Sequence, residues 1–189
     1  MSGGMRPAVV ERLGERIRTA RQELDLSVGS LAELSDVSRR MLTQIELGQA
    51  NPSVAILDRI AAGLGTTFAA LMGVGADDAP EGVEIWSTDT GSWAVLLDAM
   101  DTASVSVETW KWKLVGEDVY QGGSGVAQPG IMLHVIEGAL EVDRAEGAQV
   151  VEAGGSVRMV SQGDYSYRAR DAQAAVFFSV ALLPRPARG

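Results

Sequence analysis

The segment of residues 38–53 combines a helical pattern with side chains that can recognise DNA bases. Ser38 is a favourable N-cap, Gly48 closes the predicted helix, and Leu42 and Ile45 form its apolar side. The opposite side displays Arg39, Arg40, Thr43 and Gln44. In a major groove, guanidinium groups match guanine and amides match adenine, so this pattern predicts base recognition. An ordinary solvated helix face has a similar composition, and the prediction therefore depends on the neighbouring elements.

Helical periodicity on both sides of this segment predicts the elements that position it. Upstream, apolar residues at spacings of three and four mark a first helix; they are Val10, Leu13, Ile17, Ala20 and Leu24. A second helix is expected after Ser27 and ends at residues 35–37, where Asp36 tolerates the left-handed conformation of a tight turn. Downstream, residues 51–53 open a fourth helix that ends at Gly65, and a short fifth helix follows.

Residues 12–72 resemble the five-helix DNA-binding domain of the lambda-repressor and Cro-like regulators, chiefly through the run SRRMLTQIELGQANPSVAILDRIAAGLG. The resemblance implies base contacts at Arg39, Arg40 and Gln44, and with the neighbouring Ser38 and Thr43 these residues form the expected DNA-contact set. It also implies an ion pair between Arg21 of the first helix and Glu46 of the recognition helix. Two positions depart from the family pattern. Val28 replaces a glutamine that touches a phosphate, and Asp36 replaces the turn glycine.

Length and charge suggest two small domains of different character. The chain has 189 residues and a net charge of −9. Residues 1–75 hold 8 basic and 8 acidic residues, whereas residues 76–189 hold 8 basic and 17 acidic residues. The negative charge therefore belongs to the second part of the chain. Such an excess argues against indiscriminate binding to nucleic acids or membranes. The absence of cysteine excludes disulfides and thiolate metal sites. With no signal peptide and no apolar stretch near roughly 18 residues, we expect a cytoplasmic protein.

The periodicity changes from helical to alternating near residue 83. We therefore predict a helix-turn-helix domain at residues 8–73, a small acidic linker at 74–82 and a β domain at 83–189. The predicted strands are 106–114, 131–136, 140–142, 150–151, 157–160, 165–169 and 174–183. Short strands at this spacing indicate a sandwich or a jelly-roll barrel, and hence an α+β multidomain protein.

The runs IMLHVIEGALEV and VVEAGGSVRMVSQGDYSYRARD resemble the paired motifs of the cupin superfamily, within residues 105–183. Counted from Gly138, the metal-binding glutamate of that family falls on Ile131, and the histidine of the second motif falls on Ser166. The remaining ligands would fall within residues 122–127, which contain no histidine. Since none of these positions offers a metal donor, we expect no metal, no cofactor and no enzyme activity.

The barrel interior then becomes a candidate effector pocket. The predicted lining comprises Trp110, Trp112, Ile131, Leu133, Ser166 and Arg168. The only histidine, His134, is expected on the outer face because it lies three residues from Ile131. An alternative, which we favour for Arg168 and Arg170, places these side chains at the rim, in solvent or beside acidic neighbours. Aromatic stripes on strands, such as the two tryptophans, are more often plain core than pocket lining.

These patterns predict a transcription regulator that binds operator DNA as a homodimer and whose metal-free barrel senses a small organic effector. One alternative is a cupin enzyme with an appended DNA-binding module, which would require clustered histidine and glutamate. The other is a dimeric DNA-binding protein whose barrel binds no ligand.

Overall fold

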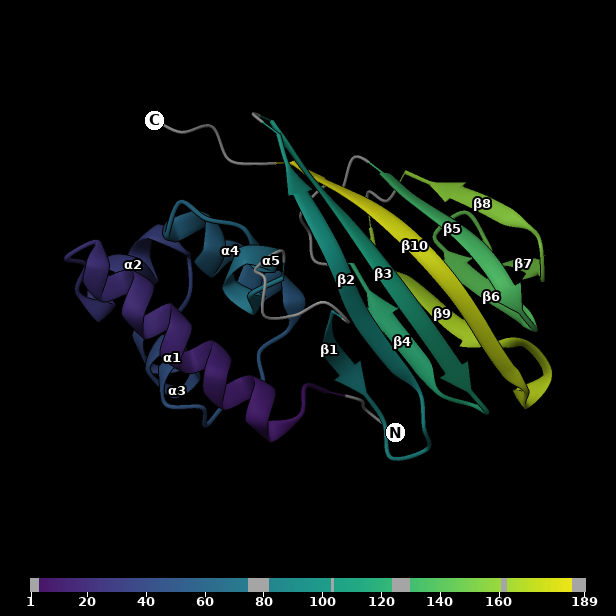
Figure 1. Ribbon diagram of the computed structural model, residues 1–189, viewed down its shortest axis with the longest axis horizontal. Helices are drawn as coiled ribbons and strands as arrows, with labels where there is room; N and C mark the ends of the chain where they lie inside the picture. Colours follow the sequence, from purple (N-terminus) through teal and green to yellow (C-terminus); the bar gives the residue numbers. More distant parts are fainter. Residues whose placement is uncertain (1–3, 75–81, 103, 124–129, 161–162, 185–189) are drawn as a thin grey trace.

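The structure is a computed structural model that describes residues 4–74, 82–102, 104–123, 130–160 and 163–184. A group of short helices lies beside a larger β domain, and the two are connected through residues that follow the last helix (Figure 1). The predicted linker at residues 74–82 lies almost entirely outside the described residues.

The helical domain has the expected order of elements. Its helices are α1 (Pro7–Glu23), α2 (Val28–Leu34), α3 (Arg39–Glu46), α4 (Val54–Gly63) and α5 (Phe68–Met72). The side chains of Ser27, Ser38, Ser53 and Thr67 each accept a hydrogen bond from the backbone N–H three residues later, which explains where α2 to α5 begin. The prediction that Leu24 belongs to the apolar side of the first helix is wrong. Helix α1 ends at Glu23, and Leu24 lies beyond it with its side chain exposed.

The β domain consists of two antiparallel sheets that face each other, as expected for a jelly roll (Figure 1). The six-stranded sheet has the order β1 (Val83–Ser87), β2 (Trp93–Asp101), β3 (Val105–Val115), β10 (Ala174–Pro184), β5 (Gly130–Glu137) and β8 (Ser156–Met159). The four-stranded sheet has the order β4 (Val119–Gly122), β9 (Tyr165–Ala169), β6 (Ala139–Arg144) and β7 (Gln149–Glu152). Strands β1, β2 and β4 were not predicted from the sequence.

Alternation along β3 determines what enters the core. Trp110, Trp112 and Leu114 are buried, whereas Lys111 and Lys113 point to the other face and are half-buried. The ring of Trp112 stacks on that of Phe177 in the neighbouring strand β10, with centroids 5.7 Å apart and planes 1° from parallel. These aromatic side chains fill the space between the two sheets.

The prediction that Ser166 and Arg168 face the barrel interior is wrong. In β9 it is Tyr165, Tyr167 and Ala169 that are buried, whereas Arg168 is exposed. Side chains alternate along a strand, so only one of the two sets can enter the core, and the aromatic set gains far more from leaving water. Arg168 pairs instead with Glu141 of the neighbouring strand β6, as in the favoured alternative.

The two domains contact each other through aromatic packing and a short backbone bridge. Phe68, the first residue of α5, stacks on Trp110 of β3 with ring centroids 6.2 Å apart. The amide and carbonyl groups of Gly4 both bond to Ser87 of β1, at 3.1 Å each. Gly4 therefore extends the edge of the six-stranded sheet by one bridge before α1 begins.

Candidate functional site

The N-terminal part of α3 presents its polar side chains to solvent. Ser38, Arg39, Arg40 and Thr43 are exposed and Gln44 is half-buried, whereas Leu42 and Ile45 are fully buried below them. The Ser38 hydroxyl accepts from the amide of Met41 at 3.1 Å, and this bond fixes the first turn of the helix.

A largely buried ion pair holds this helix against α1. Arg21 donates from Nε to Oε1 of Glu46 at 2.6 Å and from Nη2 to Oε2 at 2.9 Å. A third donor, Nη1, bonds to the carbonyl of Leu26 at 2.9 Å. Only 11% of the Arg21 side chain and 7% of the Glu46 side chain are exposed, so the geometry is bidentate and largely dry. The hydrogen bond to Glu46 raises the pKa of Arg21 above its usual value. The predicted pair is confirmed.

The turn between α2 and α3 adopts the conformation that the sequence predicted. Asp36 has a φ of 49°, in the left-handed region that a glycine occupies at lowest cost. The guanidinium of Arg39 packs over Gly29 of α2, where a Cβ would lie 3.1 Å from the guanidinium carbon. The Arg39 side chain of α3 thus lies close to the backbone at the start of α2.

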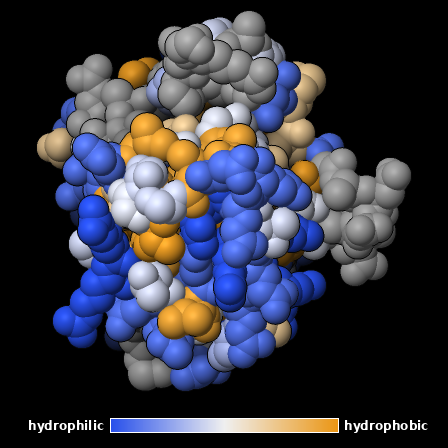
Figure 2. Space-filling model, turned by 90° about the vertical axis from the view of Figure 1, so that its left-hand side faces the viewer, coloured by the Kyte–Doolittle hydropathy of each residue, from blue (hydrophilic) through white to orange (hydrophobic). Residues whose placement is uncertain are grey.

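The helical end of the molecule is mostly hydrophilic, with separate hydrophobic spots rather than one continuous apolar face (Figure 2). The large apolar side chains exposed on the described helices and turns of this domain are Leu24, Leu34 and Leu47. A polar surface of this kind suits contact with nucleic acid better than burial against a protein core.

The barrel positions that hold a metal in cupins do not fit one here. Ile131 is buried in β5 and offers only an alkyl group, and Ser166 points away from the interior. His134 lies exposed on the outer face, as predicted, with Nδ1 2.8 Å from the Ser156 hydroxyl. Within the described part of the chain, no group of three or more histidine, cysteine, aspartate or glutamate residues could hold a metal ion.

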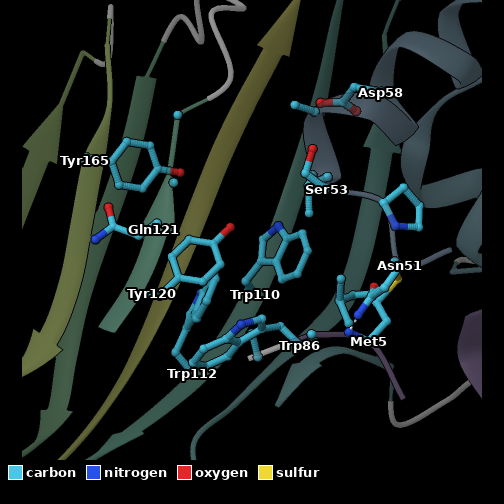
Figure 3. A pocket seen from close by; sticks show the side chains of 18 of the residues that line it. Met5, Asn51, Ser53, Asp58, Trp86, Trp110, Trp112, Tyr120, Gln121 and Tyr165 are labelled. Carbon is cyan, nitrogen blue, oxygen red and sulfur yellow. Dashed lines mark hydrogen bonds between the residues drawn. The ribbon is translucent and has the colours of Figure 1, made fainter. Parts of the chain in front are cut away.

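A cavity of about 500 Å³ lies between the helical domain and the barrel. Its helical wall includes Asn51, Ser53 and Asp58, from the start of α4 and the turn before it. Its barrel wall includes Trp86, Trp110, Trp112, Tyr120, Gln121 and Tyr165. In Figure 3 the Asp58 carboxylate lies above the space, and the Tyr120 hydroxyl and the Trp110 ring lie side by side below it.

Two carboxyl groups at this boundary are poorly solvated. Burial raises the pKa of Asp58 in the cavity wall to about 6. Glu108 of β3 is only 2% exposed, and burial, together with the charge of Asp58, raises its pKa to about 8. Trp110 donates from Nε1 to Oε2 of Glu108 at 3.0 Å, but Oε1 of Glu108 has no hydrogen-bond partner among the described residues.

The cavity matches the predicted effector pocket only in part. Trp110 and Trp112 line it, but Ile131 and Leu133 lie in the packed barrel core and are not among its described lining residues. The prediction missed Asp58 and Tyr120 in the cavity wall, and also Glu108, which accepts a hydrogen bond from the lining residue Trp110. A signal existed for Glu108, because it alternates with the two tryptophans on the buried face of β3.

Comparison with known proteins agrees with this architecture. Residues 17–71 match the HTH_3 family model, described as helix-turn-helix. An immunity repressor protein of Bacillus phage phi105 is 38% identical over 61 residues, which are 32% of this chain and 42% of the phage protein. The HTH-type transcriptional regulator SutR of Escherichia coli K12 is 25% identical over 177 residues, 92% of this chain and 96% of SutR.

The fold is also shared by a solved structure. The crystal structure of an HTH_3 family transcriptional regulator from Vibrio cholerae superposes with a TM-score of 0.69 at 24% identity, covering 95% of this chain and 99% of that one. In the described part of this chain, no helix is both long and apolar enough to cross a membrane.

Proposed function

We propose that this chain, a helix-turn-helix transcriptional regulator with a cupin-like β domain, binds operator DNA as a homodimer and responds to a small organic effector. The observation that carries the DNA-binding part is the exposed row of Arg39, Arg40 and Thr43 on a helix that the buried Arg21–Glu46 pair anchors. A recognition helix must present such side chains and must also be held rigidly.

The contact residues have separate roles in this proposal. Arg39, Arg40 and Gln44 contact base edges, because guanidinium and amide groups can form paired hydrogen bonds with guanine and adenine. Ser38 and Thr43 contact the backbone or adjacent bases from the same exposed face. The acidic barrel lies on the other side of the helical domain from α2, which keeps most of its charge away from DNA (Figure 1).

Selection of a binding site from random duplexes, followed by affinity measurement, tests this assignment. Arg40→Ala should weaken binding to the selected site by about 1 to 3 kcal/mol and relax the base preference at one position. Arg170→Ala is a matched control, since it removes the same charge from an exposed position after β9, at the end of the barrel away from α3 (Figure 1). Equal weakening of binding to all duplexes would show that Arg40 contacts a phosphate rather than a base. Unchanged binding would show that Arg40 does not contact the DNA.

The homodimer is supported by apolar side chains on the outer face of the six-stranded sheet. Met132 and Ile136 of β5 are 48% and 44% exposed on either side of His134, and Val180 of β10 lies directly opposite Met132. Burial of such a face against a second copy would remove it from water. A two-fold dimer would also match a palindromic operator.

The sensing role is supported by the cavity between the domains, whose volume is in the range of small-molecule sites. A barrel that served only to dimerise the protein would not need this space. The proposal treats the barrel as a metal-free, non-catalytic domain, because the positions of the cupin ligands hold Ile131 and Ser166.

A further inference from the structure

We infer that the cavity between the helical domain and the barrel binds a small organic cation, such as an alkylammonium compound, against the Trp110 and Tyr120 rings and the Asp58 carboxylate. This inference names the class of effector and therefore rests on the proposed sensing function. It depends on three features: the aromatic wall of the cavity, the uncompensated carboxyl groups of Asp58 in that wall and of Glu108 next to it, and the connection of the cavity to the recognition helix.

The barrel wall of the cavity is an aromatic cluster. Trp110 stacks near Trp112 with ring centroids 5.6 Å apart, and Tyr120 meets Trp112 edge-on at 4.6 Å. Trp86 approaches Tyr120 edge-on at 5.5 Å. Rings set at different angles around one space present several π faces, and π faces attract a weakly hydrated cation. Apolar ligands would also favour such a wall, so the aromatic cluster alone does not define the charge.

The carboxyl groups define the charge. Asp58 lines the cavity and forms no ion pair with any residue that the structure describes, and Glu108 lies behind Trp110 with Oε1 unpartnered. Asp58 is also the only charged side chain among the described lining residues. Neither carboxyl group forms an ion pair with a described residue, so a bound cation would provide their opposite charge.

An anion is the main competitor, because the first residues of α4 also line the cavity and helix N-termini attract negative charge. The N-terminus contributes about half a positive charge. The Ser53 hydroxyl already accepts from the amide of Ile56 at 3.4 Å. The full charge of Asp58, reinforced by Glu108, outweighs this partial charge when the two carboxyl groups ionise.

The cavity is placed to influence the recognition helix. Asn51 and Ser53 belong to the connection between α3 and α4, and Asn51 accepts a hydrogen bond from the amide of Met5 at 3.4 Å. The adjacent Gly4 is bonded to β1. A ligand that contacts both walls would therefore tie the end of the recognition helix to the barrel.

Three isosteric probes separate charge from shape: choline, its neutral carbon analogue 3,3-dimethylbutan-1-ol and the anion 3,3-dimethylbutanoate. Binding to the full-length protein is followed by tryptophan fluorescence and calorimetry at pH 8. Choline should bind about tenfold or more tightly than the neutral analogue, and Asp58→Asn should abolish that preference while leaving the neutral analogue unaffected. Asp89→Asn, the same change at an exposed turn of the barrel, should bind like the wild type.

Each other outcome overturns the inference. Equal affinity for choline and the neutral analogue would show an apolar pocket, tighter binding of the butanoate would show an anion site, and no binding of any probe would exclude a site for compounds of this kind. Operator affinity of the same proteins without probe is measured in parallel. If the wild type binds no operator DNA, the proposed function is refuted. If it binds operator DNA but shows no preference for the cation, only this inference is refuted.

Discussion

Replacement of Glu108 by glutamine should change how the stability of this protein depends on pH. Glu108 is buried beside the contact between the two domains, and burial raises the pKa of its carboxyl from the ordinary 4.5 to about 8. Glutamine has nearly the same shape, and its amide oxygen can still accept a hydrogen bond from Trp110. The substitution therefore removes the titration of this position and leaves its packing nearly intact.

The size and sign of the effect follow from the two pKa values. Between pH 4.5 and about 8 the folded protein retains a proton that the unfolded chain has released, so the free energy of unfolding falls by about 1.4 kcal/mol for each pH unit. The stability is fully present below pH 4.5 and is lost as the pH rises through 8. Across the interval the loss is at most about 5 kcal/mol.

The groups that face Glu108 do not reverse this expectation. Asp58 of α4 and Asp101 of β2 are both acidic, and their negative charges raise the pKa of Glu108 further. The pKa of Asp58 is itself raised to about 6, so its own contribution has the same sign. Because Asp58 is present in wild type and variant alike, most of its contribution cancels in the comparison.

Urea denaturation followed by tryptophan fluorescence and circular dichroism, repeated from pH 5 to pH 9, measures the difference. Wild type should lose several kcal/mol relative to Glu108→Gln as the pH rises. Glu117→Gln, the same substitution at an exposed position, serves as the matched control. Parallel stability curves for wild type and Glu108→Gln would refute the reasoning, since a buried carboxyl that titrates normally could not be desolvated as described.

The remaining predictions concern the ion pair, the dimer and the barrel. Arg21→Ala and Glu46→Ala should each destabilise the helical domain by about 3 kcal/mol, because each single change leaves a buried charge unpaired. The double variant should lose much less than the sum of the two single losses. Additive losses in chemical denaturation would contradict this prediction. Sedimentation equilibrium should show a dimer at micromolar concentration that Met132→Glu dissociates, and a monomeric wild type would exclude the proposed interface. Metal analysis of the untagged protein should find no stoichiometric transition metal, whereas zinc or iron bound within the barrel would overturn the reading of Ile131 as a lost ligand position.

Local features of the sequence predicted the helical domain and its candidate site well. The N-cap of Ser38 and the apolar pair Leu42 and Ile45 fix the start and the orientation of α3, since both act within two turns of helix. Arg21 and Glu46 lie 25 residues apart, and composition alone did not pair them. The resemblance to a known helical domain supplied that contact.

The sequence by itself thus determined the helices, most strands and the polar face of α3, because caps and periodicity are properties of neighbouring residues. In β9 the motif alignment chose the wrong face, and the tertiary structure corrected it. There Tyr165 and Tyr167 exclude Ser166, as their alternation with polar residues would have indicated without the motif alignment. Only the tertiary structure brings Asp58 and Glu108 to one boundary, because α4 and β3 are separate in the sequence and meet when the helical domain packs on the barrel. A cavity between domains is a property of that packing, and no pattern within either segment encodes it.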